Sequence, residues 1–290
     1  VIWDCGNGAS GPVTERLVAR LDGTHKVLFP EIDGTFPNHH PNPVDPETLE
    51  LLRAEVAAAG ADLGIGFDGD GDRIGIIDGK GRQVPGDLLT AFLAKDVAAR
   101  HPGAPILLDV KSSEAALRLV ESAGAAAQIW KTGHSHMKKR MKELAAPLAG
   151  EMSGHIFIAD GYLGFDDAIY AAVRVITQMV KGGQSVTEFM DSLPEQHATP
   201  ELRIDCADTV KFGSMEKIRA HVLSRHDAAD VNSIDGVRVK SGDGWWLIRA
   251  SNTEAALVAR AEASDRPALD RLLGDIETTL AAAGLDWKRP

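Results

Sequence analysis

The stretch Leu63-Gly64-Ile65-Gly66-Phe67-Asp68-Gly69-Asp70-Gly71-Asp72-Arg73 joins an apolar segment to three carboxylates at every second position. The apolar half has the length and composition of a buried strand. Upstream, the sequence predicts strands over 1–5 and 26–29 and helices over 13–21 and 46–59, so the whole run alternates as an α/β sheet does. Ligands of such sheets bind beyond the carboxyl ends of the strands, which is where the aspartate loop falls.

The aspartate loop has the composition of a magnesium site. Glycine lets the loop curl, so that Asp68, Asp70 and Asp72 can turn toward one point. Hard carboxylate oxygens suit Mg²⁺, which is usually shared with a substrate phosphate, and Arg73 can hold a phosphate oxygen. An EF-hand calcium loop is excluded, because its sixth and twelfth positions would be Arg73 and Gly79. A solvated acidic turn is the other alternative, although crowded carboxylates repel one another without a cation.

Two further regions follow the first α/β run. Predicted helices 87–99, 114–123, 137–144 and 166–181, with strands 106–109 and 128–131, form a second α/β unit. After a proline-containing linker at 193–200, strands 201–206 and 256–261, a hairpin over 236–250 and helices 214–224 and 267–283 indicate an α+β domain. We therefore predict domains over residues 1–82, 83–194 and 195–290.

Composition limits the partners. The chain of 290 residues carries 31 Lys and Arg against 42 Asp and Glu, a net charge of −11, which argues against nucleic acid. No apolar run approaches a membrane span, so no membrane partner is expected. Cys5 and Cys206 form no metal or disulfide pattern, which favours a cytoplasmic setting.

Five more segments accompany the aspartate loop in a fixed order: Asp33-Gly-Thr-Phe-Pro-Asn-His-His-Pro-Asn-Pro43, Asp109-Val-Lys-Ser-Ser113, Lys131-Thr-Gly-His-Ser135, Gly150-Glu-Met-Ser-Gly-His155 and Arg249-Ala-Ser-Asn-Thr253. With these segments the chain resembles the α-D-phosphohexomutases, phosphomannomutase/phosphoglucomutase enzymes that move a phosphate between C1 and C6 of a hexose. The resemblance implies two similar three-layer α/β domains with mixed sheets, followed by a smaller α+β (TBP-like) domain. It also implies Mg²⁺, a phosphoserine enzyme and a hexose 1,6-bisphosphate intermediate.

The resemblance assigns roles to the remaining motifs. Glu151 and Ser153 would hold sugar hydroxyls, and the distal phosphate would bind the loop that contains Arg249, Ser251, Asn252 and Thr253. The expected catalytic residues are Arg73, Lys111, His134 and His155, with the general acid/base left open among the last three. The expected ligands are glucose and mannose 1- and 6-phosphates and the 1,6-bisphosphate, because Met152 is typical of enzymes that accept both sugars and glutamine there typifies phosphoglucosamine mutases.

The chain departs from the family pattern in two places. The family's Ser-His-Asn-Pro loop, which carries the phosphate, is absent, so we expect a fragment without the nucleophile domain that is inactive on its own. A non-catalytic sugar-phosphate binding protein and a phosphoglucosamine mutase are the alternatives. The phosphate loop continues Glu254-Ala255 where the family usually has Glu-Pro, which should leave it less rigid.

Two rival interpretations rest on short patterns. Gly6-Asn-Gly-Ala-Ser-Gly11 fits the dinucleotide fingerprint G-x-G-x-x-G, but the family carries a similar turn here without a nucleotide, so a structural turn is preferred. His39, His40, His134 and His136 could suggest zinc, yet no Cys or Glu completes a ligand set at the usual spacing.

Overall fold

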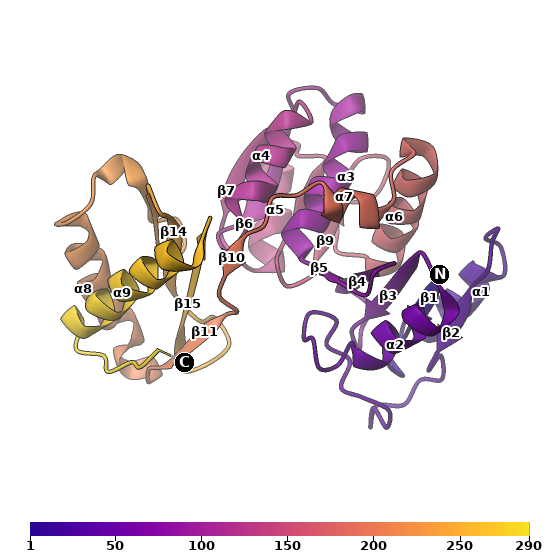
Figure 1. Cartoon of the computed structure of the whole chain (residues 1–290), viewed down its shortest axis with the longest axis horizontal. Coiled ribbons are helices and arrows are strands. Elements are labelled where there is room, and N and C mark those ends of the chain that lie inside the picture. The colour runs from indigo at the N-terminus through magenta and orange to yellow at the C-terminus, as the bar shows by residue number, and fades with distance from the viewer. Residues whose placement is uncertain (290) are drawn as a thin grey trace. The chain divides into compact units, whose positions relative to one another are not determined.

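Two mixed sheets built on the same plan occupy the first part of the chain (Figure 1). In the computed structural model, which describes residues 1–289, the first sheet has the order β2-β1-β3-β4-β5 and the second β7-β6-β8-β9. In each sheet three parallel strands are followed by an antiparallel one. The strands are β1 (Ile2–Asp4), β2 (Lys26–Leu28), β3 (Leu63–Phe67), β4 (Ile74–Asp78), β5 (Gln83–Val84), β6 (Pro105–Asp109), β7 (Ala126–Trp130), β8 (Leu148–Gly150) and β9 (Ile156–Ile158).

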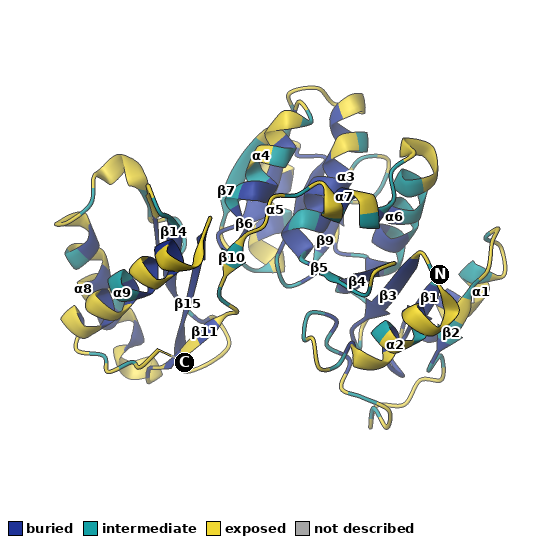
Figure 2. Ribbon diagram, viewed as in Figure 1, coloured by how far each residue is buried: buried dark blue, intermediate teal, exposed yellow. Residues whose placement is uncertain are grey.

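One apolar core spans both sheets. It joins Trp3, Ile65 and Phe67 of the first sheet to Ile106 and Leu108 of the second, and Figure 2 shows these central strands as buried. The helices of this part are α1 (Gly11–Val18), α2 (Glu50–Ala59), α3 (Gly86–Arg100), α4 (Glu114–Ser122), α5 (His134–Leu144), α6 (Ala168–Gly182) and α7 (Val186–Asp191). Of these, α6 packs against β4 of the first sheet and β9 of the second. Residues Val1–Leu193 therefore form one compact unit.

The second compact unit begins at Pro194. Its antiparallel sheet has the order β10-β15-β14-β13-β12, with β11 also paired to β15. Helices α8 (Asp208–Leu223) and α9 (Arg266–Ala282) cover one face, where Trp246, Ile248 and Ile276 share a core. The strands are β10 (His197–Ala198), β11 (Leu202–Asp205), β12 (Val231–Asn232), β13 (Val237–Ser241), β14 (Gly244–Ala250) and β15 (Ala256–Ala263), and a 3₁₀ turn spans Ala228–Asp230.

The predicted fold class is confirmed, and the differences are local. The sequence did not predict β4, β8 and β9; β4 pairs with its neighbours in sequence, β3 and β5, and the short strand β9 pairs with β8. The predicted linker contains β10, which pairs with β15. Helix α8 starts at Asp208 rather than 214, because Gly213 lowers helix propensity by only about 1 kcal/mol and does not end the helix.

The predicted domain boundaries differ from the division into two compact units. The predicted boundary at 82/83 lies inside the first compact unit, directly before β5, and the one at 194/195 lies next to the unit boundary. The three-domain division stays a prediction.

None of the described helices has the length and hydropathy to cross a bilayer.

Candidate active site

The aspartate loop is fixed through its first carboxylate. Asp68 follows β3 directly and is buried. Its Oδ1 accepts hydrogen bonds from the backbone N–H groups of Gly71, Asp72 and Arg73, each at 3.0 Å. Burial opposes ionisation of Asp68, but these contacts and the Arg73 charge hold its pKa below the usual value. The loop is thus pre-formed around a negative charge.

Arg73 closes the same loop. Its Nε donates to Asp68 Oδ2 at 2.7 Å, and its Nη1 donates to Asn42 Oδ1 at 3.2 Å. Only Nη2 has no hydrogen bond to residues 1–289. Arg73, which was expected to bind a phosphate, is therefore already paired with a carboxylate. In this conformation it can offer only one edge of its guanidinium group to a phosphate.

The three loop carboxylates fit a magnesium ion. Oxygen atoms of Asp68, Asp70 and Asp72 lie within 4.8 Å of one another, with Asp70 exposed and Asp72 half-buried. Burial raises the pKa of Asp72 to about 6, and the charges of Asp68 and Asp70 contribute. A cluster of carboxylate oxygens is the donor set that Mg²⁺ prefers.

The glycine-rich turn at Gly6–Gly11 supports this loop. The N–H of Ala9 donates to Gly69 O at 2.8 Å. A Cβ on Gly8 would lie 2.8 Å from Gly69 O and 2.9 Å from Asp68 O, so only glycine permits this approach. At the start of α1, a Cβ on Gly11 would overlap the Pro30 carbonyl. The turn contacts protein backbone where a dinucleotide would need open space, which agrees with its interpretation as a structural turn.

The predicted sugar loop, residues 150–155, meets the aspartate loop backbone to backbone. Gly154 has φ of +92° and a Cβ there would lie 2.6 Å from Ile74 O, while the N–H of Ile74 donates to Gly154 O at 3.0 Å. A β-bridge pairs Arg73 with His155. Motifs that lie about eighty residues apart in the chain thus form one rigid corner.

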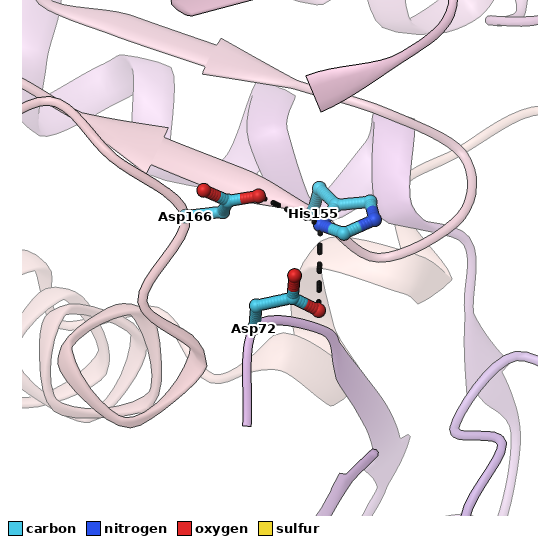
Figure 3. A group of neighbouring side chains, drawn as sticks. All are labelled: Asp72, His155 and Asp166. Atoms are coloured by element: carbon cyan, nitrogen blue, oxygen red, sulfur yellow. Dashed lines mark ion pairs between the residues drawn. The ribbon is translucent and has the colours of Figure 1, made fainter. Parts of the chain in front are cut away.

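His155 lies between two aspartates (Figure 3). Its Nδ1 is 3.1 Å from Asp166 Oδ2 and 3.7 Å from Asp72 Oδ1. Burial alone would lower the pKa of His155, but Asp166, Asp72 and Glu151 together raise it. The pKa of Asp166 is lowered despite burial, because His155 and Lys138 favour its ionised form.

His134 belongs to the same group. It is the first residue of α5, and its ring stacks on that of His155 with centroids 5.7 Å apart. Its Nδ1 is 3.5 Å from Asp166 Oδ2, and Lys138 Nζ lies 2.8 Å from Asp166 Oδ1. Two of the three candidates for general acid/base therefore share one buried carboxylate.

Glu151 is buried and already has protein partners. Its Oε1 accepts from the N–H of Gly133 at 2.9 Å and its Oε2 accepts from the Ser153 hydroxyl at 3.0 Å. Burial raises the pKa of Glu151, and the nearby Asp109 adds to the effect. Glu151 and Ser153 therefore form one hydrogen-bonded pair that also fixes the start of α5.

Lys111 follows β6 and is buried, with its Nζ 4.0 Å from Asp109 Oδ2. Asp109 is fully buried and accepts hydrogen bonds from the Ser112 and Thr132 hydroxyls and from the N–H of Met152. One carboxylate thus ties the Lys111 turn to the sugar loop.

The predicted phosphate loop lies in the second unit and is described by itself. Arg249, near the end of β14, is buried and donates from Nε to Asp235 Oδ2 at 3.1 Å, while its buried Nη2 makes no hydrogen bond to residues 1–289. Ser251 Oγ accepts from the N–H groups of Thr253 and Glu254 at 3.4 and 3.1 Å. Asn252 and Thr253 are exposed.

A buried lysine fastens this loop. Lys211 Nζ donates to the carbonyl oxygens of Ser251 and Glu254 at 2.9 and 2.8 Å. The two carbonyls lie at either end of the loop, so one ammonium closes it. Lys211 supplies a restraint where the family's proline is missing.

Sequence reasoning missed Asp166, Lys138 and Lys211. Asp166 was noted only as a helix start, and the β-bridge between Phe157 and Asp166 brings it to the site. An aspartate pair before an apolar helix was the available signal for Asp166. Lys138 and Lys211 carried none, because lysines on helices are usually solvated.

Comparison with known proteins gives the family. Sequence profiles for phosphoglucomutase/phosphomannomutase match residues 1–81 (alpha/beta/alpha domain II), 85–197 (alpha/beta/alpha domain III) and 201–279 (C-terminal domain). This chain belongs to the phosphoglucomutase/phosphomannomutase family of mutases.

Individual relatives agree. The chain is 45% identical to phosphomannomutase/phosphoglucomutase of Pseudomonas putida over 97% of its own length and 60% of the relative's. It is 38% identical to a phosphoglucomutase of Neisseria gonorrhoeae over 93% of its length and 58% of that protein's. The chain spans about 60% of the length of the curated relatives it matches.

A solved family member from Burkholderia thailandensis superimposes with a TM-score of 0.90 at 39% identity, over 98% of this chain and 61% of that one. An Aspergillus fumigatus N-acetylphosphoglucosamine mutase, solved with GlcNAc-6P and magnesium, gives 0.68 at 17% identity over 96% of this chain and 65% of that one. The latter is a likeness of fold.

Proposed function

We propose that this chain forms the metal- and sugar-binding part of a phosphomannomutase/phosphoglucomutase. The parent protein would interconvert hexose 1-phosphate and hexose 6-phosphate through a phosphoserine and a hexose 1,6-bisphosphate. The observation that carries this proposal is the corner where the N–H of Ile74 binds Gly154 O. It holds the aspartate loop and the Glu151 loop together, as transfer between a metal-bound phosphate and a sugar requires.

In this proposed function, separate groups of residues bind the metal, bind phosphate and exchange protons. Asp68, Asp70 and Asp72 would hold Mg²⁺, which supplies charge neutralisation to a phosphate when bound. Arg73 and Lys111 add positive charge for phosphate oxygens. His155 and His134 hold protons beside Asp166 and are the candidates for proton exchange with a sugar hydroxyl.

Arg249 supports the phosphate-loop assignment. A guanidinium nitrogen that is buried without a partner is costly, and an anion would satisfy it. The backbone amides of Thr253 and Glu254 already converge on Ser251 Oγ. We assign the distal phosphate of the substrate to this loop.

The proposed substrates are glucose and mannose phosphates. Glu151 and Ser153 would bind O3 and O4, which the two sugars share, and Met152 between them favours this pair over glucosamine phosphates. Both cysteines are free and buried, which suits the proposed cytoplasmic setting. The nucleophile is absent from the 290 residues, so this chain alone is proposed to bind substrates without turnover.

Magnesium titration of the 290-residue chain tests the proposal. Asp70→Asn should weaken Mg²⁺ binding at least about tenfold, since an exposed ligand is lost without disturbing the core. Asp22→Asn is the matched control, because Asp22 is exposed and lies before the amino end of the outer strand β2, whereas the aspartate loop follows the carboxyl end of β3. Equal Mg²⁺ affinities of the two variants and the wild type in calorimetry would refute the metal assignment.

Ligand binding separates the alternatives. Glucose 1-phosphate and mannose 1-phosphate should bind with similar affinities, and glucosamine 1-phosphate more weakly. Preference for glucosamine phosphate would favour a phosphoglucosamine mutase. Turnover of glucose 1-phosphate by the purified chain would contradict the assignment of the nucleophile to a region outside it.

A further inference from the structure

Three side chains from separate segments form a second donor cluster. Asp72 comes from the aspartate loop, His155 from the predicted sugar loop and Asp166 from the segment before α6 (Figure 3). One donor atom of each lies within 4.8 Å of the other two. The cluster contains an imidazole nitrogen, which distinguishes it from the all-oxygen aspartate loop.

Two atoms of this cluster are buried without a hydrogen bond. Asp166 is 9% exposed, and its Oδ2 has no hydrogen-bond partner among residues 1–289. The same is true of His155 Nδ1. These two atoms lie 3.1 Å apart, so the distance is short but the contact lacks hydrogen-bond geometry. Lys138 binds the other oxygen, Asp166 Oδ1, at 2.8 Å and so fixes the carboxylate.

The spacing suits a small tetrahedral ion. Zinc lies about 2.0–2.2 Å from nitrogen and carboxylate oxygen, which places neighbouring ligands roughly 3.3 Å apart. The distances from His155 Nδ1 to Asp166 Oδ2 and to Asp72 Oδ1 are 3.1 and 3.7 Å, on either side of that value. Three protein ligands would leave the fourth position open, because the Asp72 side chain is 30% exposed.

We propose that Asp72, His155 and Asp166 form a second metal site, which takes a borderline divalent cation such as Zn²⁺ or Co²⁺ and shares Asp72 with the aspartate loop. The imidazole selects against Mg²⁺, which prefers oxygen ligands in octahedral geometry. This metal site needs side chains from three segments that are distant in the sequence, so no spacing of residues in the sequence reveals it.

Sharing Asp72 makes the two sites antagonistic. A cation on His155 and Asp166 withdraws one of the three carboxylates from the aspartate loop, so each ion weakens the binding of the other. This consequence rests on the proposed magnesium site, whereas the second site does not. In the mutase, the ion would also block the His155 proton position and act as an inhibitor.

Cobalt absorption tests the site in the 290-residue chain at about pH 8, where imidazole binds metals readily. Tetrahedral Co²⁺ should give an intense visible spectrum that Zn²⁺ abolishes. Asp166→Asn should lower Zn²⁺ and Co²⁺ affinity at least tenfold. Asp70→Asn is the matched control: it should leave the cobalt spectrum unchanged, while weakening Mg²⁺.

The outcomes separate the two sites. Loss of cobalt binding in Asp70→Asn, equal affinity of Asp166→Asn and the wild type, or a weak octahedral spectrum would each overturn the second site. Failure of Asp70→Asn to weaken Mg²⁺ would count against the aspartate loop alone. His155→Gln repeats the test if Asp166→Asn does not fold, and unchanged cobalt binding in it would also overturn the proposal.

Discussion

Arg73 Nε donates a hydrogen bond to Asp68 Oδ2 at 2.7 Å. The other oxygen of the same carboxylate anchors the aspartate loop. On the proposed metal assignment, this guanidinium and a magnesium ion would compete for one oxygen. Metal binding would then release Arg73 for contact with a phosphate. Asp78 and Arg82 show the same contact, Nε to Oδ2 at 2.7 Å, in a loop without further aspartates.

Replacing Arg73 should have opposite effects on two ligands. Arg73→Gln should tighten Mg²⁺ binding about fivefold, because removing a nearby positive charge is worth roughly 1 kcal/mol, and should weaken glucose 1-phosphate binding. Arg82→Gln is the matched control, with no expected change in either affinity. Calorimetry in which Arg73→Gln weakens Mg²⁺ binding would show that the arginine supports the metal site.

Gly8 should influence the conformation of the aspartate loop, although the two are far apart in the sequence. Gly8→Ala places a Cβ against the carbonyls of Asp68 and Gly69, so the loop must shift and Mg²⁺ affinity should fall several-fold. Gly34→Ala serves as control, because nothing lies within 4 Å of its Cβ position. Identical magnesium titrations of the two variants would argue against the close approach.

Glu151 should contribute to sugar affinity without distinguishing glucose from mannose. Glu151→Ala should weaken both sugar 1-phosphates by about 1.5–3 kcal/mol, the value of one hydrogen bond to a charged group. It should also lower the melting temperature, because the N–H of Gly133 loses its acceptor. Glu151→Gln keeps a carbonyl acceptor and should retain most of the stability. Selective loss of mannose 1-phosphate in calorimetry would point instead to a contact at C2.

Lys211 should set the order of the phosphate loop. Lys211→Met keeps the length of the side chain but leaves the Ser251 and Glu254 carbonyls without this donor. Hydrogen exchange of residues 251–254 should therefore accelerate, and inorganic phosphate should bind at least about fivefold more weakly. Lys211→Arg retains a donor and should recover part of both. Faster exchange in Lys211→Met with unchanged phosphate affinity would place the anion elsewhere.

Asp160 should stabilise the fold only above acidic pH. It accepts hydrogen bonds from Arg100, His101 and Arg174, and although burial opposes this, they hold its pKa well below the usual value. The stabilising contribution is complete above the unfolded-state pKa near 4 and is lost as pH falls toward the lower folded-state value. Asp160→Asn should therefore unfold about 1.5–3 kcal/mol more easily at pH 7, and denaturant curves of the two proteins should converge below about pH 4. A constant difference down to pH 3 would mean that the charge of Asp160 is unimportant.

The local parts of the site were predictable from sequence, and the long-range parts were not. The strand before Asp68 and the turn at Gly6–Gly11 follow from patterns of adjacent residues. The engagement of Arg73 by Asp68 was missed because a phosphate was assumed as its only partner. Asp166 reaches His155 through a β-bridge, and Lys211 reaches Ser251 from another helix. Such contacts depend on strand register and helix placement, which no single segment specifies.

The core that joins Trp3 and Phe67 to Ile106 and Leu108 restricts how this protein can be divided or recombined. Residues 1–82 produced alone would expose to water the apolar surface that normally meets the second sheet, and would be prone to aggregate. A chimera that exchanges only one of the two sheets with a relative would combine surfaces that did not evolve together. Engineering of the metal loop and of sugar preference should therefore transfer residues 1–193 as a single block.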